Sequence, residues 1–280
     1  MVNSPPNLAT VDMRIGDRQF EHLSSLITHH FGIQVPDQKR PLLTQRLRQV
    51  VVEAGYHDFD SFFEAHFTRS PSIEMLGRLI DRVSTNHTFF WRESDHLVHF
   101  RDVVLPQIIA GGSRDLRLWC AAAATGEEPW TLAMLVASAM PAGWAGGLLA
   151  TDISARALST AQRGVYKAEN VSRLPDALRD RWMVRGADDT LRVVDALRSE
   201  VTWRRLNLVG AAFNYKRSMD VVFCRNVMIY FDETTRRDVV ARIAQVTRPG
   251  GWLFIGHSET LGRGDPAWRF ERPGVYRRVA

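Results

Sequence analysis

The chain has 280 residues, of which 45% are hydrophobic and 24% charged, a composition typical of a globular protein with one large domain or two smaller ones. No stretch is apolar over the roughly 18 residues that a membrane span needs, and the first residues lack the basic and apolar regions of a secretion signal, so we expect a cytoplasmic protein. The net charge of +5 favours an acidic partner but does not choose among nucleic acid, anionic lipid and acidic protein.

Residues 1–80 predict a helical domain. Apolar side chains recur at helical spacing within 20–31, a second helix is expected between 37 and 55, and four phenylalanines suggest a third within 59–67. The second helix is basic, which indicates either a solvated face or a docking face for an acidic partner. Its basic side chains are Lys39, Arg40, Arg46 and Arg48.

Residues 81–280 alternate between strand-like and helix-like segments. The strands are nearly continuous apolar runs, which is typical of a parallel sheet covered by helices on both faces, and this predicts an α/β fold. Pro249, Gly250 and Gly251 are expected to end the last helix. Strands are expected at 115–123, 146–154, 201–208, 219–226 and 252–258, helices at 127–140, 154–166 and 232–247, and a closing hairpin at 268–279.

Residues 168 to about 200 interrupt this alternation. They contain short β-like pieces around a turn, RGADD, at 185–189. This pattern predicts a small subdomain inserted into the larger domain. The two cysteines, Cys120 and Cys224, both lie in apolar strands, where they are expected to be small buried hydrophobes rather than a disulfide or a metal site.

Polar residues at the carboxyl ends of the strands deserve most weight, because ligands of open parallel sheets bind there. The first strand runs into AAAATGEEPW, in which Gly126 permits a tight turn. The pattern is not G-x-G-x-x-G. Glu127 and Glu128 would repel a phosphate and suit a positively charged ligand, although they could also simply complement the helix dipole.

Asp152 ends the second strand, in ATDIS. An acidic side chain at this position holds ribose hydroxyls in nucleoside-binding folds, and the alternative is a helix-capping role beside Ser154. A ribose site without a phosphate loop, next to carboxylates, predicts S-adenosylmethionine. That ligand has a ribose, an ammonium and a sulfonium but no phosphate.

Two further segments place polar groups among apolar ones. STNHTFFWRES at 84–94 carries Asn86, Thr88 and Arg92 among aromatic residues, so it is either a packed hinge or one wall of a ligand cleft. FCRNVMIYF at 223–231 interrupts an apolar strand with Arg225 and Asn226.

The sequence resembles the chemotaxis receptor methyltransferases, the CheR family, from about residue 15 to 278. The resemblance rests on STNHTFFWRES, WCAAAATGEEPWTLAM, ATDISARALSTAQRGVY, FCRNVMIYFDETTRRDVVARI and PGGWLFIGHSE, in this order. It implies a class I S-adenosylmethionine-dependent methyltransferase domain with a Rossmann-like, mostly parallel seven-stranded sheet, an N-terminal helical domain and an inserted antiparallel β-subdomain. It also implies methylation of glutamate side chains on the cytoplasmic helical bundle of chemoreceptors, with S-adenosylhomocysteine as the product.

The same resemblance implies roles for individual residues. Arg92 and Tyr230 would lie near the acceptor carboxylate, and Arg46 and Arg48 would dock on the receptor. The residues implied to contact the cofactor are Asn86, Thr88, Arg92, Glu127, Asp152, Asn207, Leu208, Arg225 and Asn226. Ala124 and Trp130 stand where relatives often have serine and tyrosine. The turn in RGADDTLRV is shorter than in relatives that bind a tethering pentapeptide, so we expect a pentapeptide-independent member.

An ionised glutamate, with an ordinary pKa of about 4.3, needs no general base, so catalysis reduces to positioning and exclusion of water around an in-line attack on the methyl group. Arg92 is expected to orient the carboxylate and Tyr230 to donate a hydrogen bond or shape the path of the methyl group. No metal, nucleic acid or membrane insertion is expected, and the chain is expected to act as a monomer. Two alternatives remain: a nucleic-acid methyltransferase, whose usual catalytic motifs are missing from the fourth strand, and a regulatory module that binds S-adenosylmethionine without catalysis.

Overall fold

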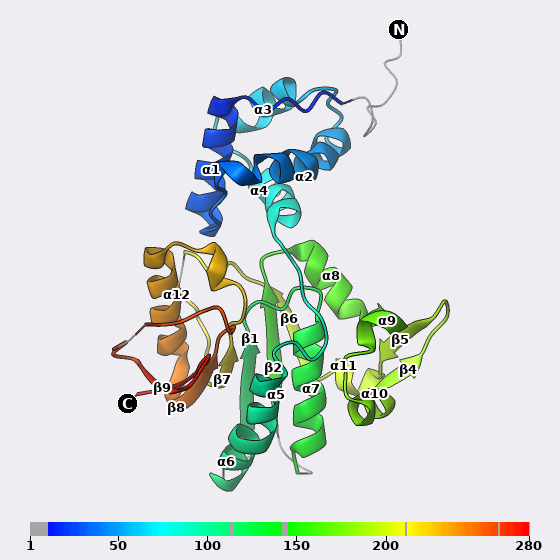
Figure 1. Cartoon of the computed structure of the whole chain (residues 1–280), viewed down its shortest axis with the longest axis vertical. Coiled ribbons are helices and arrows are strands. Elements are labelled where there is room, and N and C mark those ends of the chain that lie inside the picture. Colours follow the sequence, from blue (N-terminus) through cyan, green and yellow to red (C-terminus); the bar gives the residue numbers. More distant parts are fainter. Residues whose placement is uncertain (1–10, 113–114, 142–144, 211, 263, 280) are drawn as a thin grey trace. The chain divides into compact units, whose positions relative to one another are not determined.

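The computed structural model describes residues 11–112, 115–141, 145–210, 212–262 and 264–279. The first ten residues, which were assigned above to the helical domain and examined for a secretion signal, lie outside this part. The chain divides into two compact units, Met1–Thr85 and Asn86–Ala280 (Figure 1). The boundary drawn near residue 80 from the sequence falls inside a helix that continues to Val83, which is why the units divide slightly later.

The first unit is helical, and each helix buries one apolar face. The helix that the sequence analysis did not name separately, α4, begins where Ser72 accepts a hydrogen bond from the Met75 backbone N–H. Asp58 caps α3 in the same way, because its carboxylate accepts a hydrogen bond from the Ser61 backbone N–H. The helices are α1 (Asp17–Phe31), α2 (Arg40–Glu53), which follows a 3-10 turn at Asp37–Lys39, α3 (Phe59–Phe67) and α4 (Ile73–Val83).

The second unit is built on a seven-stranded sheet with the order β6-β2-β1-β7-β8-β10-β9. The five strands from β6 to β8 run parallel, and the last two pair antiparallel as the predicted closing hairpin. This confirms the predicted α/β class and the mostly parallel sheet. The strands are β1 (Asp115–Cys120), β2 (Ala145–Asp152), β6 (Val201–Arg205), β7 (Met219–Phe223), β8 (Thr247–Phe254), β9 (Trp268–Arg272) and β10 (Val275–Arg278).

Helices pack against this sheet over a large apolar core. Phe223 and Phe254 stack in parallel with their ring centroids 4.3 Å apart, and Trp119 and Trp130 are fully buried. Cys120 and Cys224 are buried free thiols, as expected, and burial raises the pKa of both well above its ordinary value. The helices are α5 (Ser94–His99), which continues through a π-helical segment at Phe100–Val104 into α6 (Leu105–Ala110), then α7 (Glu127–Ala139), α8 (Ala155–Arg163) and α12 (Glu233–Val246).

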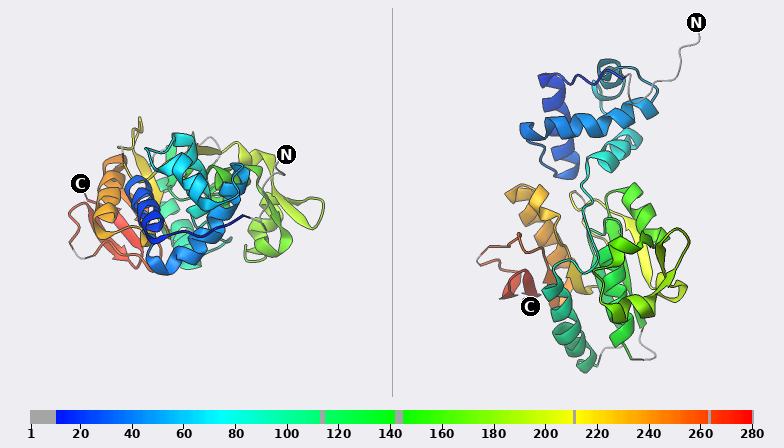
Figure 2. Two further views of the ribbon diagram at one scale, coloured as in Figure 1. Left: turned by 90° about the horizontal axis from the view of Figure 1, so that it is seen from above. Right: turned by 45° about the vertical axis from the view of Figure 1, so that its right-hand side comes forward.

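The predicted insertion is a separate antiparallel sheet with the order β3-β5-β4. It and α12 lie on opposite sides of the second unit (Figures 1 and 2). It begins slightly before the predicted residue 168, because β3 already pairs with β5. Asp188 and Asp189 adopt left-handed backbone conformations in the tight turn between β4 and β5. Its elements are β3 (Val165–Lys167), α9 (Ala168–Val171), α10 (Asp176–Trp182), β4 (Met183–Arg185), β5 (Thr190–Val193) and α11 (Asp195–Arg198).

The last helix ends within one residue of its predicted end at 247, but the predicted role of the residues after it is wrong. The helix α12 stops at Val246, and the strand β8 begins at once, so that Pro249, Gly250 and Gly251 lie within a strand rather than before it. The pairing of β7 with β8 shifts register between Met219 and Val221, and a Cβ at Gly251 would lie 3.0 Å from the Asp220 carbonyl oxygen. The proline and glycines therefore accommodate an irregular strand.

None of the helices in the described part of the chain has the length and apolar character required to cross a membrane.

Candidate functional site

The strand order reverses between β1 and β7, so the loops that follow their carboxyl ends flank a switch point of the sheet. Backbone hydrogen bonds tie the loop that follows β1 to the carboxyl ends of β7 and β2. The Ala121 N–H donates to the Phe223 carbonyl at 2.8 Å, and the Ala123 N–H donates to the Thr151 carbonyl at 2.8 Å. The predicted strand-end residues of β1, β2 and β7 are thus brought to one edge of the sheet.

The turn from β1 to α7 is tightly packed. Gly126 has φ +101°, and a Cβ there would lie 2.7 Å from the Tyr166 hydroxyl and 2.9 Å from the Ala161 Cα. Only glycine combines this conformation with this approach. Trp130 is fully buried and donates from Nε1 to the Ala161 carbonyl at 3.0 Å.

Asp152 joins this turn to the end of β2. Its carboxylate accepts hydrogen bonds from the Ala124 N–H at 2.8 Å and the Ser154 N–H at 2.9 Å, and the residue is 8% exposed. Ser154 itself caps α8 by accepting from the Ala157 N–H at 3.1 Å. The place of Asp152 at the end of β2 and its carboxylate acceptors fit the hydroxyls of a ribose.

Replacing Asp152 by alanine should therefore weaken S-adenosylmethionine binding by about 10- to 100-fold, because hydrogen bonds to a charged group contribute roughly 1.5–3 kcal/mol. Calorimetric titration of the purified protein measures this. The matched control is Asp176→Ala, an aspartate of the insertion with an 81% exposed side chain, which should bind normally. Normal binding by Asp152→Ala would show that the ribose assignment is wrong.

The two carboxylates at the start of α7 have different surroundings. Glu127 is buried and accepts from the Thr125 hydroxyl at 2.7 Å, and burial raises its pKa. Glu128 pairs with the guanidinium of Arg225 at 2.7 Å and accepts a hydrogen bond from the Cys120 thiol at 3.3 Å. Glu128 is therefore already neutralised within the protein, and Glu127 remains the better candidate for contact with a cationic ligand.

Arg225 is the centre of a buried ionic cluster. Its side chain is 1% exposed, and it pairs with Glu93 at 2.9 Å as well as with Glu128. It also donates to the Arg92 carbonyl at 2.7 Å. Burial alone would raise the pKa of Glu93, but the Asn226 amide and the Arg225 guanidinium together hold it below its ordinary value. Arg225 thus holds the segment after Arg92 against the start of α7.

Backbone strain gathers around this cluster. Trp91, Glu93, Ala124 and Asn226 all have positive φ values, between 46° and 63°. Such conformations cost free energy and persist where the surroundings enforce them, frequently at functional sites. Asn226 is held by a hydrogen bond from its side-chain amide to Glu93 at 2.9 Å. The strained positions lie in the two segments that the sequence analysis singled out and in the turn after β1.

The two predicted catalytic residues belong to the two segments that contribute Glu93 and Asn226 to this cluster. Arg92 is half-buried, donates to the His87 carbonyl at 2.8 Å, and has its guanidinium 5.7 Å from the centre of the Phe89 ring. Tyr230 is half-buried in a 3-10 turn, Met228–Tyr230, that follows Asn226. Asn86 and Thr88, upstream of Arg92, are also half-buried.

Asn207 and Leu208 lie in the loop just after β6, separated from the strand by Leu206. The Asn207 side chain accepts from the Val209 N–H at 3.0 Å, and Leu208 is buried. The Leu208 carbonyl accepts from Arg242 at 2.6 Å. A buried leucine at the carboxyl end of a strand in this sheet is compatible with packing against an adenine.

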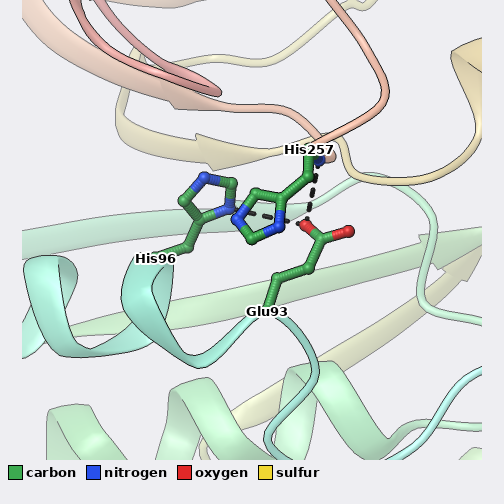
Figure 3. A group of neighbouring side chains, drawn as sticks. All are labelled: Glu93, His96 and His257. Carbon is green, nitrogen blue, oxygen red and sulfur yellow. Dashed lines mark hydrogen bonds and ion pairs between the residues drawn. The ribbon is translucent and has the colours of Figure 1, made fainter.

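Glu93, His96 and His257 form a further cluster, which the sequence analysis did not find (Figure 3). Their potential ligand atoms lie within 4.8 Å of one another. His96 is fully buried, and burial followed by the charge of Arg225 lowers its pKa to about 4, so it is neutral at neutral pH. Its Nε2 lies 3.1 Å from the Pro273 carbonyl, which places the proton on Nε2.

A metal ion at this cluster would have to share Glu93 with the Arg225 guanidinium, which contacts the same oxygen, Oε2. The repulsion between the two cations opposes binding. The His257 backbone N–H also donates to Oε2, at 3.2 Å (Figure 3). The geometry therefore favours a structural role for the cluster, in which it links the segment after Arg92 to the end of β8.

The predicted docking arginines belong to the first unit. Arg46 donates to the Val83 carbonyl at 2.5 Å and to the Thr85 hydroxyl at 3.3 Å, and Arg48 donates to the Val11 carbonyl at 3.0 Å. Both are half-buried. Each guanidinium thus fastens α2 to a neighbouring segment of its own unit, a role that the sequence pattern did not reveal.

Comparison with known proteins covers both units. Residues 86–272 match the family model described as the CheR methyltransferase, SAM binding domain, and residues 18–83 match the CheR methyltransferase, all-alpha domain. A chemotaxis protein methyltransferase of Borreliella burgdorferi is 31% identical over 99% of this chain and 100% of its own. One from Escherichia coli is 32% identical over 95% and 93%, and a probable one from Rhizobium etli is 34% identical over 87% and 92%.

The match to the SAM binding domain includes the segments that contribute Arg92, Asp152 and Tyr230. A SAM binding domain matched over residues 86–272 makes S-adenosylmethionine the cofactor. The chain belongs to the CheR methyltransferase family, with an all-alpha domain followed by a domain that binds S-adenosylmethionine.

Proposed function

We propose that this enzyme methylates glutamate side chains on the cytoplasmic helical bundle of methyl-accepting chemoreceptors, as a protein-glutamate O-methyltransferase. The observation that carries the proposal is the match of both units, in order and over nearly the whole chain, to relatives named for methylation in chemotaxis. The enzyme would work as a cytoplasmic monomer recruited to receptor arrays, with no nucleic acid as substrate.

In the proposed reaction the protein contributes mainly the positioning of the acceptor and the cofactor. When bound, the cofactor supplies a methyl group on a sulfonium. The acceptor glutamate is already ionised at neutral pH, so the protein needs no general base. Arg92 would orient the acceptor carboxylate through its planar guanidinium. Tyr230 would donate a hydrogen bond near the acceptor carboxylate and the methyl group. The aromatic residues beside Arg92 would exclude water.

The proposed cofactor contacts divide by role. Asp152 would accept the ribose hydroxyls, and Glu127 would face the methionine or ribose end. Arg225 would act on the same site through the groups it holds, since its own donors already meet Glu93, Glu128 and the Arg92 carbonyl. The remaining proposed contacts are Asn86, Thr88, Arg92, Asn207, Leu208 and Asn226.

Docking on the receptor is proposed for the exposed side of α2. A shallow hollow of about 420 Å³ on this helix is lined by Arg48 and by Arg40, Pro41, Thr44 and Gln45. Leu42 is 41% exposed nearby in the sequence. A basic, partly apolar surface suits an acidic helical partner. Arg46 and Arg48 would then contribute charge while fastening the helix.

We further propose that docking needs no tethering pentapeptide. The turn between β4 and β5 is short, and the Gly186 N–H donates to the Thr190 carbonyl at 2.9 Å directly across it. Calorimetry with a peptide ending in NWETF should accordingly give no heat of binding. Micromolar binding of this peptide would contradict the proposal.

The central test uses tritiated S-adenosylmethionine and membranes that contain chemoreceptors. Base-labile label on receptor glutamates is the expected result. Absence of label despite tight cofactor binding would instead favour a regulatory module that binds the cofactor without catalysis.

A further inference from the structure

The segment from Arg225 to Tyr230 carries three of the proposed site residues but little regular structure. It contains a left-handed residue, Asn226, with φ 57°, and a single 3-10 turn. A loop of this kind keeps one conformation only where other groups enforce it. The hydrogen bond from the Asn226 side-chain amide to Glu93 holds that side chain in place. It does not hold the backbone of the segment, which needs other partners.

The backbone of this segment is held by Glu259, a carboxylate that is 7% exposed. Its Oε1 accepts hydrogen bonds from the Met228 N–H at 2.7 Å and the Ile229 N–H at 3.2 Å. Its Oε2 accepts from the Asn226 N–H at 2.9 Å and the Gly256 N–H at 2.6 Å. The carboxylate therefore lies inside a ring of backbone donors, where a chain of N–H groups binds it as it would bind an anion.

Glu259 can reach the Asn226 backbone only because residue 256 is a glycine. A Cβ at Gly256 would lie 2.4 Å from the Asn226 side-chain nitrogen and 3.0 Å from both the Asn226 backbone nitrogen and Glu259 Oε2. The Glu259 N–H donates back to the Gly256 carbonyl at 2.9 Å, closing a tight turn after β8. The two loops that follow β7 and β8 are thus built to meet at one carboxylate.

We propose that Glu259 is a positioning residue for methyl transfer, which shapes the Asn226–Tyr230 turn without touching cofactor or acceptor. This proposal rests on the proposed function, because the proposed function places Tyr230 next to the acceptor carboxylate. The ionised carboxylate, which has two acceptor oxygens and no proton to place, satisfies all four N–H donors at once. Burial raises the pKa of Glu259, and the same four donors act against that rise.

The test compares Glu259→Gln with Glu259→Asp. The glutamine replaces an acceptor oxygen by an NH₂ donor that faces backbone donors, so the turn should shift. We expect kcat, counted per titrated cofactor-binding site, to fall about 100-fold, a size reached by displacements near 1 Å. Cofactor affinity should fall much less than kcat does, because the Asn226 side chain keeps its own hydrogen bond to Glu93. The aspartate retains the charge and should recover part of the activity.

The matched control is Glu271→Gln, a glutamate of β9 that pairs with Arg269 at 2.7 Å and should transfer methyl groups normally. Because kcat is counted per binding site, a purely structural role for Glu259 would lower the yield of folded protein and leave kcat unchanged. An unchanged kcat per site in Glu259→Gln would overturn the inference. If this variant does not fold, a kcat for Glu259→Asp equal to that of the wild type would overturn it.

A second measurement separates this inference from the proposed function. Amide hydrogen exchange at Met228 and Ile229 should become at least about tenfold faster in Glu259→Gln, because the bonds that protect them are lost. Unchanged exchange would contradict the role of Glu259 whatever the substrate is. A wild-type enzyme that labels no receptor glutamate would count against the proposed function alone.

Discussion

Replacing Arg225 by methionine is expected to lower the free energy of unfolding by about 3–5 kcal/mol, because removing one member of a buried ionic cluster leaves uncompensated charges behind. Two carboxylates would lose their partner, Glu93 with a 13% exposed side chain and Glu128 with a 12% exposed one. Methionine has a similar volume, so the loss reports charge more than packing. Denaturant unfolding followed by circular dichroism measures the change.

The control for this prediction is Arg237→Met, which breaks an ion pair with Glu233 on the surface of α12, where both side chains are more than 70% exposed. Surface pairs contribute about 0–1 kcal/mol, so this variant should unfold almost like the wild type. Adding Glu93→Gln and Glu128→Gln to Arg225→Met should restore part of the lost stability. If Arg225→Met cost no more than the surface variant, the buried cluster would not be a stabilising centre.

Replacing Arg92 by alanine is expected to lower kcat by roughly 10²- to 10³-fold, as removal of a preorganised hydrogen-bond donor does in other enzymes. Tyr230→Phe should lower kcat by about tenfold, the equivalent of one hydrogen bond. Both variants should lose less cofactor affinity than activity, because Arg92 is only one of several proposed cofactor contacts and Tyr230 is none of them. Methyl transfer to receptor membranes and calorimetric titration of the cofactor give the two quantities separately.

Arg92→Lys distinguishes charge from geometry in this prediction. Lysine retains the positive charge but not the planar, bidentate donor, so it should recover little activity if Arg92 orients the acceptor. Equal losses of transfer and cofactor affinity in Arg92→Ala would show instead that Arg92 serves mainly to bind the cofactor.

The sequence predicted the parts of this molecule that depend on local pattern. Alternating apolar strands and amphipathic helices indicated a parallel sheet. The parallel sheet in turn indicated that Asp152, Glu127 and Asn226, which lie at or just beyond the carboxyl ends of neighbouring strands, meet at one edge. The role of Pro249 and the two glycines after it was wrongly predicted, because these residues are typical of a helix stop, whereas here they lie within an irregular strand.

Contacts between distant segments could not be predicted in this way. Arg225 pairs with groups 97 and 132 positions away, and no local pattern encodes that it turns inward to two carboxylates. The string GHSE likewise gave no sign that Glu259 accepts four backbone hydrogen bonds from two loops. The signal that could have found them is the occurrence of isolated charged residues beside strictly apolar strands, where burial requires a partner.

The ionic cluster of Arg225 also constrains how this sequence can change over evolutionary time. Glu93, Glu128 and Arg225 satisfy one another, so exchanging any one of them alone passes through a protein with an unbalanced charge in its interior. Such intermediates would be removed by selection before the compensating changes arose. Three positions far apart in the chain are therefore expected to be inherited as a unit.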